Sequence, residues 1–153
     1  SEGGHLEQYD TPAEILRKPA NEFVADFLGS DRGIKRLSLI PVGAIKLDPG
    51  PVLARSATRT QAAEMMARYD IDWAAIGEGA SLEGWFTVTD LQGHDTLEHI
   101  KTRDFQIKLD PADSLREALD AVITSRTAVA AVFDGEHYLG MATVDEISRE
   151  IVQ

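Results

Sequence analysis

Residues 114–124 carry the clearest hydrophobic pattern of the chain, that of an amphipathic helix. Apolar side chains recur there at i, i+3, i+4, i+7 and i+8, which is one face of a 3.6-residue period. Ser114 and Glu117 form a capping box at the start of this pattern, and Thr58 and Gln61 open a weaker copy of it. The apolar positions are Leu115, Ala118, Leu119, Val122 and Ile123 in the clear helix and Ala62, Met65, Met66 and Tyr69 in the weaker one.

Short apolar strands surround each predicted helix. One strand leads into the helix, a second follows it, and a third comes after a glycine-containing turn. A Thr-x-x-Asp or Thr-x-x-Glu signature then begins a further helix, so that the order of elements in each half is β-α-β-β-α. The predicted strands are 52–54, 73–76 and 85–88 in the first half and 106–109, 129–133 and 139–143 in the second.

The two halves are copies of one unit, displaced by 56 residues. The window 58–91 aligns without gaps on 114–147, and seven of the 34 positions are identical. One unit leaves a sheet face uncovered, so we expect two units in tandem to pack face to face with pseudo-two-fold symmetry. We therefore predict an α+β chain of mixed α/β architecture with repeats at 34–92 and 93–153. The identical pairs are Ala62/Ala118, Ala74/Ala130, Ala75/Ala131, Gly79/Gly135, Gly84/Gly140, Thr87/Thr143 and Val88/Val144.

Residues 1–33 precede the repeats and follow a different pattern. A short strand near residues 5–9 and a helix that begins at Thr11-Pro12 are predicted, followed by a second helix over about 21–28. About 30 residues cannot enclose a hydrophobic core alone. This strand and helix tail therefore indicates the end of a larger domain.

The phrase that closes each repeat resembles the G-x-x-T-x-x-D-[LI] ending of CBS (cystathionine β-synthase) domains. This resemblance covers roughly residues 34–153, and the β-α-β-β-α order and the duplication agree with a tandem CBS pair, or Bateman module. The resemblance implies that this chain, like other Bateman modules, pairs with a second copy into a disc-like homodimer. The two phrases read Gly84-Trp85-Phe86-Thr87-Val88-Thr89-Asp90-Leu91 and Gly140-Met141-Ala142-Thr143-Val144-Asp145-Glu146-Ile147.

Residues 1–33 resemble the C-terminal end of an ABC-transporter ATPase domain. Two resemblances in this order imply the ATPase subunit of a glycine betaine, carnitine, choline or proline importer with C-terminal CBS domains. The expected role is then non-catalytic regulation of an osmoprotectant importer, at the cytoplasmic face of the membrane and together with its ATPase and membrane subunits. The motif reads Gly4-x-Leu6-x-Gln8-Tyr9-x-Thr11-Pro12-x-Glu14-Ile15-Leu16, then Pro19-Ala20-Asn21-x-Phe23-Val24-x-x-Phe27-Leu28-Gly29.

The CBS resemblance implies an adenine nucleotide between the repeats, with AMP, ATP or cyclic di-AMP as candidates and no obligatory cofactor. Asp90 would hold the ribose and Thr87 a phosphate or sugar oxygen, with Glu146 and Thr143 as their counterparts. A carboxylate accepts strong hydrogen bonds from both ribose hydroxyls, and a helix N-terminus suits a phosphate. Glu146 departs from the Asp of the motif by one methylene group, which shifts its carboxylate.

Helix capping is a structural interpretation of the same residues. Thr-x-x-Asp/Glu before an apolar run is itself a capping box, which needs no ligand. A bound phosphate would also need nearby positive charge, for which the sequence offers Arg55, Arg59, Arg103 and Lys108, each of which would otherwise be a solvated surface charge. Capping and ligand binding both remain open at this point.

Composition narrows the classes of function. The formal net charge of −11 makes nucleic acid a poor partner, since its binding draws on Lys and Arg. The chain has no cysteine, no apolar run long enough to cross a bilayer, and no phosphate loop or nucleophile motif, so we predict neither an enzyme nor a membrane-inserted protein. The alternative to a ligand sensor is a ligand-free dimerisation platform that responds to salt screening of this acidic charge.

Overall fold

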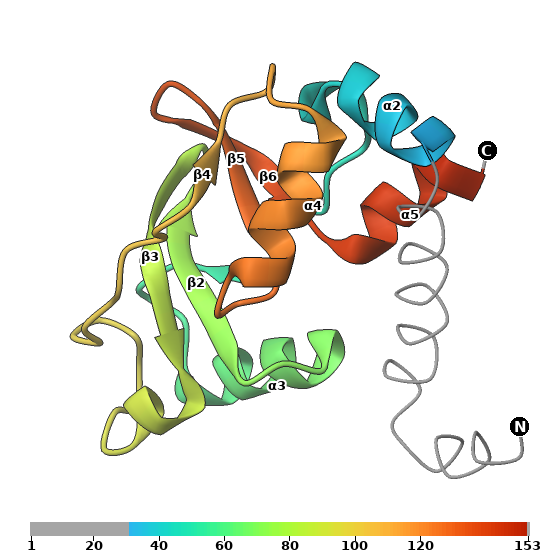
Figure 1. Ribbon diagram of the computed structural model, residues 1–153. Coiled ribbons are helices and arrows are strands. Elements are labelled where there is room, and N and C mark those ends of the chain that lie inside the picture. Colours follow the sequence, from blue (N-terminus) through green and yellow to red (C-terminus); the bar gives the residue numbers. More distant parts are fainter. Residues whose placement is uncertain (1–30, 153) are drawn as a thin grey trace, which may run out of the picture.

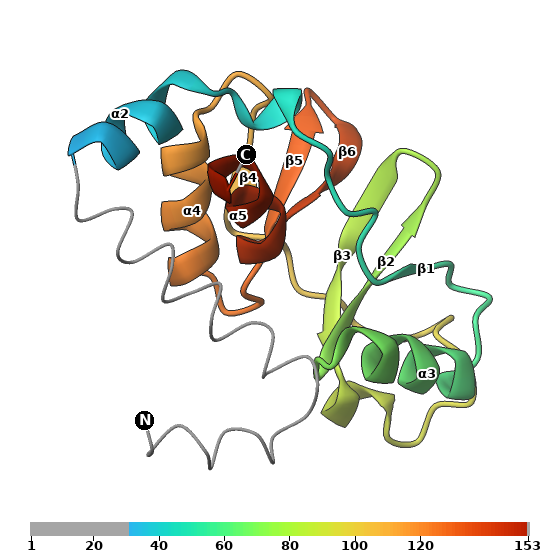
Figure 2. The ribbon, with the colours of Figure 1, turned by 90° about the vertical axis from the view of Figure 1, so that its right-hand side faces the viewer.

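The computed structural model describes residues 31–152, and these form two repeats that lie side by side (Figures 1 and 2). The strand and helices predicted within residues 5–28 lie outside the described residues. In chain order the elements are α2 (Asp31–Leu39), η2 (Val42–Ala44), β1 (Val52–Leu53), α3 (Arg59–Tyr69), β2 (Trp73–Glu78), β3 (Ser81–Thr87), η3 (Val88–Leu91), β4 (Lys108–Leu109), α4 (Leu115–Thr124), β5 (Ala130–Asp134), β6 (His137–Ala142) and α5 (Val144–Val152).

Each repeat contains one three-stranded mixed sheet, and the two sheets have the same topology. The strand orders are β1-β2-β3 and β4-β5-β6, with the first pair parallel and the second antiparallel. The register shifts after Ile76 in one hairpin and after Val132 in the other, positions that differ by the 56 residues of the repeat. The α+β class and the duplicated β-α-β-β order are therefore confirmed.

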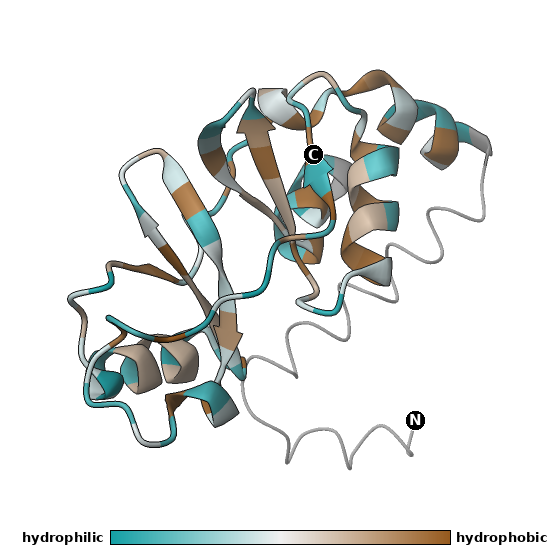
Figure 3. Cartoon of the chain, turned by 90° about the vertical axis from the view of Figure 1, so that its left-hand side faces the viewer, coloured by the Kyte–Doolittle hydropathy of each residue, from teal (hydrophilic) through white to brown (hydrophobic). Residues whose placement is uncertain are grey.

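Both central helices begin where the capping boxes predict. The side chains of Thr58 and Ser114 accept hydrogen bonds from the backbone N–H groups of Gln61 and Glu117, and both reciprocal bonds are present. Apolar residues, brown in Figure 3, recur along the helices and strands of both repeats. Four of the five predicted apolar positions of α4 are buried, whereas Ile123 is 65% exposed.

The closing helix of the first repeat is the element that the sequence predicted wrongly. A full helix is expected after Thr87, but the chain forms only the four-residue 3-10 helix η3, whereas α5 in the second repeat has nine residues. Gln92 is extended, with φ −61° and ψ 128°, and Gly93 follows with φ +82°, a left-handed conformation that does not continue a right-handed helix. The element order is thus β-α-β-β-α only in the second repeat.

The entry segment, which we define as residues 40–51, runs along the second repeat before it reaches β1 (Figure 2). The Ile40 carbonyl accepts a hydrogen bond of 2.8 Å from Leu115 N, and Asp48 forms an antiparallel bridge with Met141. Leu37 of α2, together with Val42, lies in the hydrophobic core of the second repeat. The predicted range 34–92 for the first repeat therefore includes residues that pack on its neighbour.

Candidate functional site

A cleft of about 570 Å³ lies between the repeats and is lined by residues of both. The entry segment contributes Asp48 and Gly50, the first repeat contributes Tyr69, and the second repeat contributes Thr143 and Glu146. Most of the remaining lining is apolar. A largely apolar cleft of this size with a few polar groups has the features of a small-molecule site.

Thr143 and Glu146 meet at the start of α5. Glu146 Oε1 accepts a hydrogen bond of 3.0 Å from Thr143 N and a second one from the Thr143 hydroxyl. Glu146 Oε2 lies 3.5 Å from Arg149 Nη1, and the Glu146 side chain is buried. One carboxylate oxygen thus caps the helix, and the other has a single long ion-pair contact.

Burial sets the ionisation of this carboxyl. Removal from water raises the pKa of Glu146 above its ordinary value, and Asp48 raises it further, while hydrogen bonds from Thr143 act in the opposite direction. Asp48 itself is held by hydrogen bonds of 2.8 Å from Tyr69 Oη and 2.7 Å from Gly50 N to its Oδ1 atom. Burial and the bond to Asp48 raise the pKa of Tyr69 to about 12.

Thr87 and Asp90 of the first repeat do not line this cleft. Asp90 Oδ2 accepts hydrogen bonds of 2.8 Å from Thr87 N and 3.1 Å from the Thr87 hydroxyl. Arg103 Nη1 and Nη2 donate to Asp90 Oδ2 and Oδ1 at 2.5 and 3.4 Å, and they hold the pKa of Asp90 below its ordinary value, with Thr87 adding to that effect. Of the two predicted threonine–carboxylate pairs, only Thr143 and Glu146 therefore line the cleft.

The four basic residues considered for phosphate binding do not line this cleft, and each has another partner. Arg55 pairs with Glu83 and Arg103 with Asp90, while Arg59 lies 3.9 Å from Asp95 and the Lys108 ammonium lies 5.1 Å from the Phe133 ring centroid. Arg149 is the basic side chain in the described lining of the cleft. Sequence reasoning missed it, together with Asp48, although the helix predicted after Thr143 places Arg149 about one turn beyond Glu146.

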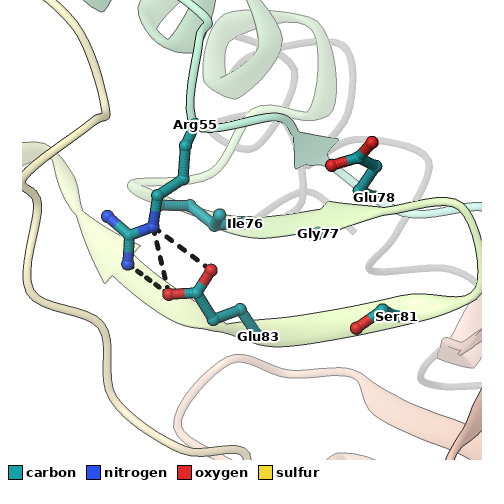
Figure 4. Close-up of a pocket in the computed structure, with 6 residues that line it drawn as sticks. All are labelled: Arg55, Ile76, Gly77, Glu78, Ser81 and Glu83. Atoms are coloured by element: carbon teal, nitrogen blue, oxygen red, sulfur yellow. Dashed lines mark hydrogen bonds and ion pairs between the residues drawn. The ribbon is translucent and has the colours of Figure 1, made fainter.

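A second cavity, of about 430 Å³, lies beside the first hairpin and contains an ion pair (Figure 4). Arg55 Nε lies 3.2 and 3.1 Å from the two carboxylate oxygens of Glu83. Arg55 Nη1 also donates to three backbone carbonyls of the chain that connects the repeats, at 2.8–3.0 Å: Leu97, Glu98 and Ile100. The guanidinium is thus committed to a structural role.

Replacing Arg55 by alanine is expected to lower the free energy of unfolding by about 1–2 kcal/mol. The three backbone carbonyls would lose the hydrogen bonds from its guanidinium, and water would replace only some of them. Urea unfolding followed by circular dichroism measures this. Arg59→Ala is the matched control, since its ion pair is solvent-exposed, and we expect a change within about 0.5 kcal/mol. Equal losses in both variants would contradict the structural role of Arg55.

The described residues contain no group of three or more His, Asp or Glu side chains arranged to hold a metal ion. Within residues 31–152, none of the helices has the length and apolar character needed to span a membrane.

Comparisons with known proteins identify relatives of this chain among transport proteins. No family model matches the chain. The osmoprotectant import ATP-binding protein OsmV of Salmonella typhimurium is 30% identical over 149 residues, which is 95% of this chain and 39% of that protein. The carnitine transport ATP-binding protein OpuCA of Listeria monocytogenes is 38% identical over 87 residues, 56% of this chain and 22% of that protein. The chain thus spans about two fifths or less of these relatives.

Solved structures show the same fold. CBSX2, a CBS-pair protein of Arabidopsis thaliana, matches with a TM-score of 0.60 and 14% identity over 74% of this chain and 95% of that one. CBSX2 in complex with AMP matches with a TM-score of 0.58 and 14% identity over 74% of this chain and 97% of that one. OpuCA of Staphylococcus aureus gives 0.52 and 15% identity over 69% of this chain and 95% of that one. The chain therefore has the fold of a tandem CBS-domain pair, and its sequence is similar to part of the ATP-binding subunits of osmoprotectant and carnitine importers.

Proposed function

We propose that this module binds an adenine nucleotide in the cleft between its repeats and thereby biases the ATPase to which it is attached. The observation that carries the proposal is the buried carboxyl of Glu146 at the wall of an apolar cleft, beside the Thr143 hydroxyl and the N-terminus of α5. The complex of CBSX2 with AMP supports the choice of ligand class. AMP, ATP and cyclic di-AMP are the candidates.

The chemistry of the cleft divides a nucleotide among three kinds of group. The carboxylate of Glu146 would accept hydrogen bonds from the ribose hydroxyls, which are strong because the acceptor is charged. Apolar side chains such as Ile71 and Val129 would cover the adenine, and Arg149 would face a phosphate. The Thr143 hydroxyl, which donates to Glu146, would hold that carboxylate in place for the ribose. In this proposal Thr143 and Glu146 form the ligand-binding pair.

Regulation would follow from the path of the chain. Asp48, Gly50 and Pro51 line the cleft and belong to the entry segment, which continues from α2. A ligand that favours one arrangement of these residues would favour one arrangement of what precedes α2, to the extent of its differential affinity. In the full protein we place this module on the cytoplasmic side, in a homodimer that works with the ATPase and membrane subunits.

Isothermal titration calorimetry of the chain with AMP, ATP and cyclic di-AMP tests the proposal. We expect at least one of the three to bind, and Glu146→Gln to weaken that binding about tenfold, because a neutral amide replaces a charged acceptor. Glu136→Gln is the matched control, since Glu136 lies exposed in the β5–β6 turn and should leave the affinity unchanged. Silence of all three ligands at millimolar concentration would reject nucleotide sensing.

The second candidate is a ligand-free dimerisation platform of the same subunit. A shallow depression on α3 and η3 is lined by the small side chains Ala63 and Ala67 and by Val88, which is 50% exposed. Such a surface permits close approach of a second copy. A dimer that dissociates in Val88→Glu, in a protein that binds none of the three nucleotides, would favour this candidate.

A further inference from the structure

The duplication allows the two half-sites to be compared residue by residue. The 56-residue shift relates Glu146 to Asp90 and Met141 to Trp85. Both Met141 and Trp85 form an isolated antiparallel bridge with the segment that leads into a repeat. Met141 exchanges backbone hydrogen bonds of 2.7 and 3.0 Å with Asp48, and Trp85 exchanges bonds of 2.8 and 2.9 Å with Arg103. Asp48 and Arg103 are therefore structural counterparts.

These counterparts carry opposite charges. Asp48 cannot form an ion pair with the Glu146 carboxyl, and its Oδ1 atom instead accepts hydrogen bonds from Tyr69 and Gly50. Arg103 pairs with both oxygens of Asp90. Both oxygens of Asp90 are thus engaged by Arg103, whereas Glu146 Oε2 has only the 3.5 Å contact with Arg149 and the residue lines the cleft.

Arg103, the partner of Asp90, also belongs to a cluster of side chains around the Trp85 ring. The Arg103 guanidinium lies 5.2 Å from the Trp85 ring centroid, and that of Arg126 lies 6.0 Å from the same ring. Arg126 comes from the second repeat and pairs with Asp72 of the first at 3.2 Å. Trp85 Nε1 donates to the Asp104 carbonyl at 3.2 Å, which fixes the indole in this cluster.

We propose that Arg103 closes the half-site of the first repeat, so that only the cleft beside Glu146 is open to a ligand. The proposal rests on the proposed function for the identity of that ligand, but the closure itself concerns the chain's own residues. An asymmetric module of this kind binds one nucleotide per chain, although its sequence repeats the whole threonine–carboxylate signature.

Calorimetry with AMP tests the asymmetry. We expect one AMP per chain, an affinity within twofold of wild type in Asp90→Asn, and an affinity about tenfold lower in Glu146→Gln. Two AMP molecules per chain, or a tenfold loss in Asp90→Asn, would overturn the proposal. Circular dichroism of each variant confirms that it is folded before the titration.

A second measurement needs no ligand and separates the closure from the proposed function. Titration of the Asp90 carboxyl by ¹³C NMR should give a pKa below the ordinary value in wild type, and a higher one in Arg103→Ala. Arg116→Ala, which removes an exposed arginine on α4, is the control and should leave this pKa unchanged. If AMP does not bind but the Asp90 titration responds to Arg103, the proposed function fails for AMP and the closure stands. An Asp90 titration that ignores Arg103 overturns the closure.

Discussion

Replacing Leu37 by alanine is expected to lower the free energy of unfolding by about 3 kcal/mol, although Leu37 lies outside both copies of the aligned repeat window. Its side chain is fully buried in the core of the second repeat, among residues of α4 and α5 such as Leu115 and Ile147. Truncation to alanine removes buried methyl groups and leaves a cavity that the surrounding helices fill only in part. Urea unfolding followed by circular dichroism measures the loss.

Leu39→Ala provides a control two residues away on the same helix. Leu39 is 80% exposed, so its truncation should change the free energy of unfolding by no more than about 0.5 kcal/mol. A similar, small effect of both substitutions would show that α2 does not pack on the second repeat in solution. The difference between the two variants therefore reports chiefly on the docking of α2, since leucine and alanine are both good helix formers.

Gly140→Ala is expected to cost about 2–4 kcal/mol of stability. Gly140 adopts φ +146°, and a Cβ atom there would lie 2.8 Å from Leu47 Cβ and 3.0 Å from the Asp48 carbonyl oxygen. The added methyl group would thus force the entry segment away from β6, where Asp48 forms its bridge with Met141. Thermal and urea unfolding both measure this loss.

Gly135→Ala separates close packing from backbone strain. Gly135 has φ +65°, but a Cβ atom added there would meet no other atom within 4 Å, so alanine should cost only about 1–2 kcal/mol. Equal losses at Gly135 and Gly140 would mean that the close approach of the entry segment contributes nothing to the loss at Gly140.

Gly84 is the counterpart of Gly140 in the first repeat, and a neighbouring segment approaches it just as closely. A Cβ atom at Gly84 would lie 2.6 Å from the Arg103 carbonyl oxygen. Both glycines of the repeated phrase are therefore required because a chain segment passes too close for a side chain.

Local pattern was sufficient to predict most of the fold. The capping boxes located the starts of α3 and α4, and the period of the apolar residues identified the buried face of α4 at every predicted position except Ile123. These features depend on residues close together in sequence, which the pattern along one chain reports directly. The helix expected after Thr87 stays short for a local reason too, because Gln92 is extended and Gly93 has φ +82°, so neither residue continues it.

The candidate site was predictable only in part. Thr143 and Glu146 do line the cleft, but the partners that distinguish them from Thr87 and Asp90 come from distant segments. Asp48 lies in the cleft although it precedes Glu146 by almost 100 residues in the sequence. The position of Arg103 in the sequence likewise does not predict its ion pair with Asp90. Periodicity reports which side of an element is buried, and it carries no information about which residues of a remote segment lie opposite.

The bridges formed by Asp48 and Arg103 have a consequence for how the duplication can be divided. Each repeat is preceded by a segment that bonds to the hairpin of the other: Asp48 to Met141, and Arg103 to Trp85. Each repeat is thus hydrogen-bonded through its hairpin to the segment that precedes the other repeat. A cut between Gln92 and Gly93 would therefore release two fragments that have each lost a bonding partner, and the pair, not the single copy, is the smallest unit whose hydrogen bonds are complete.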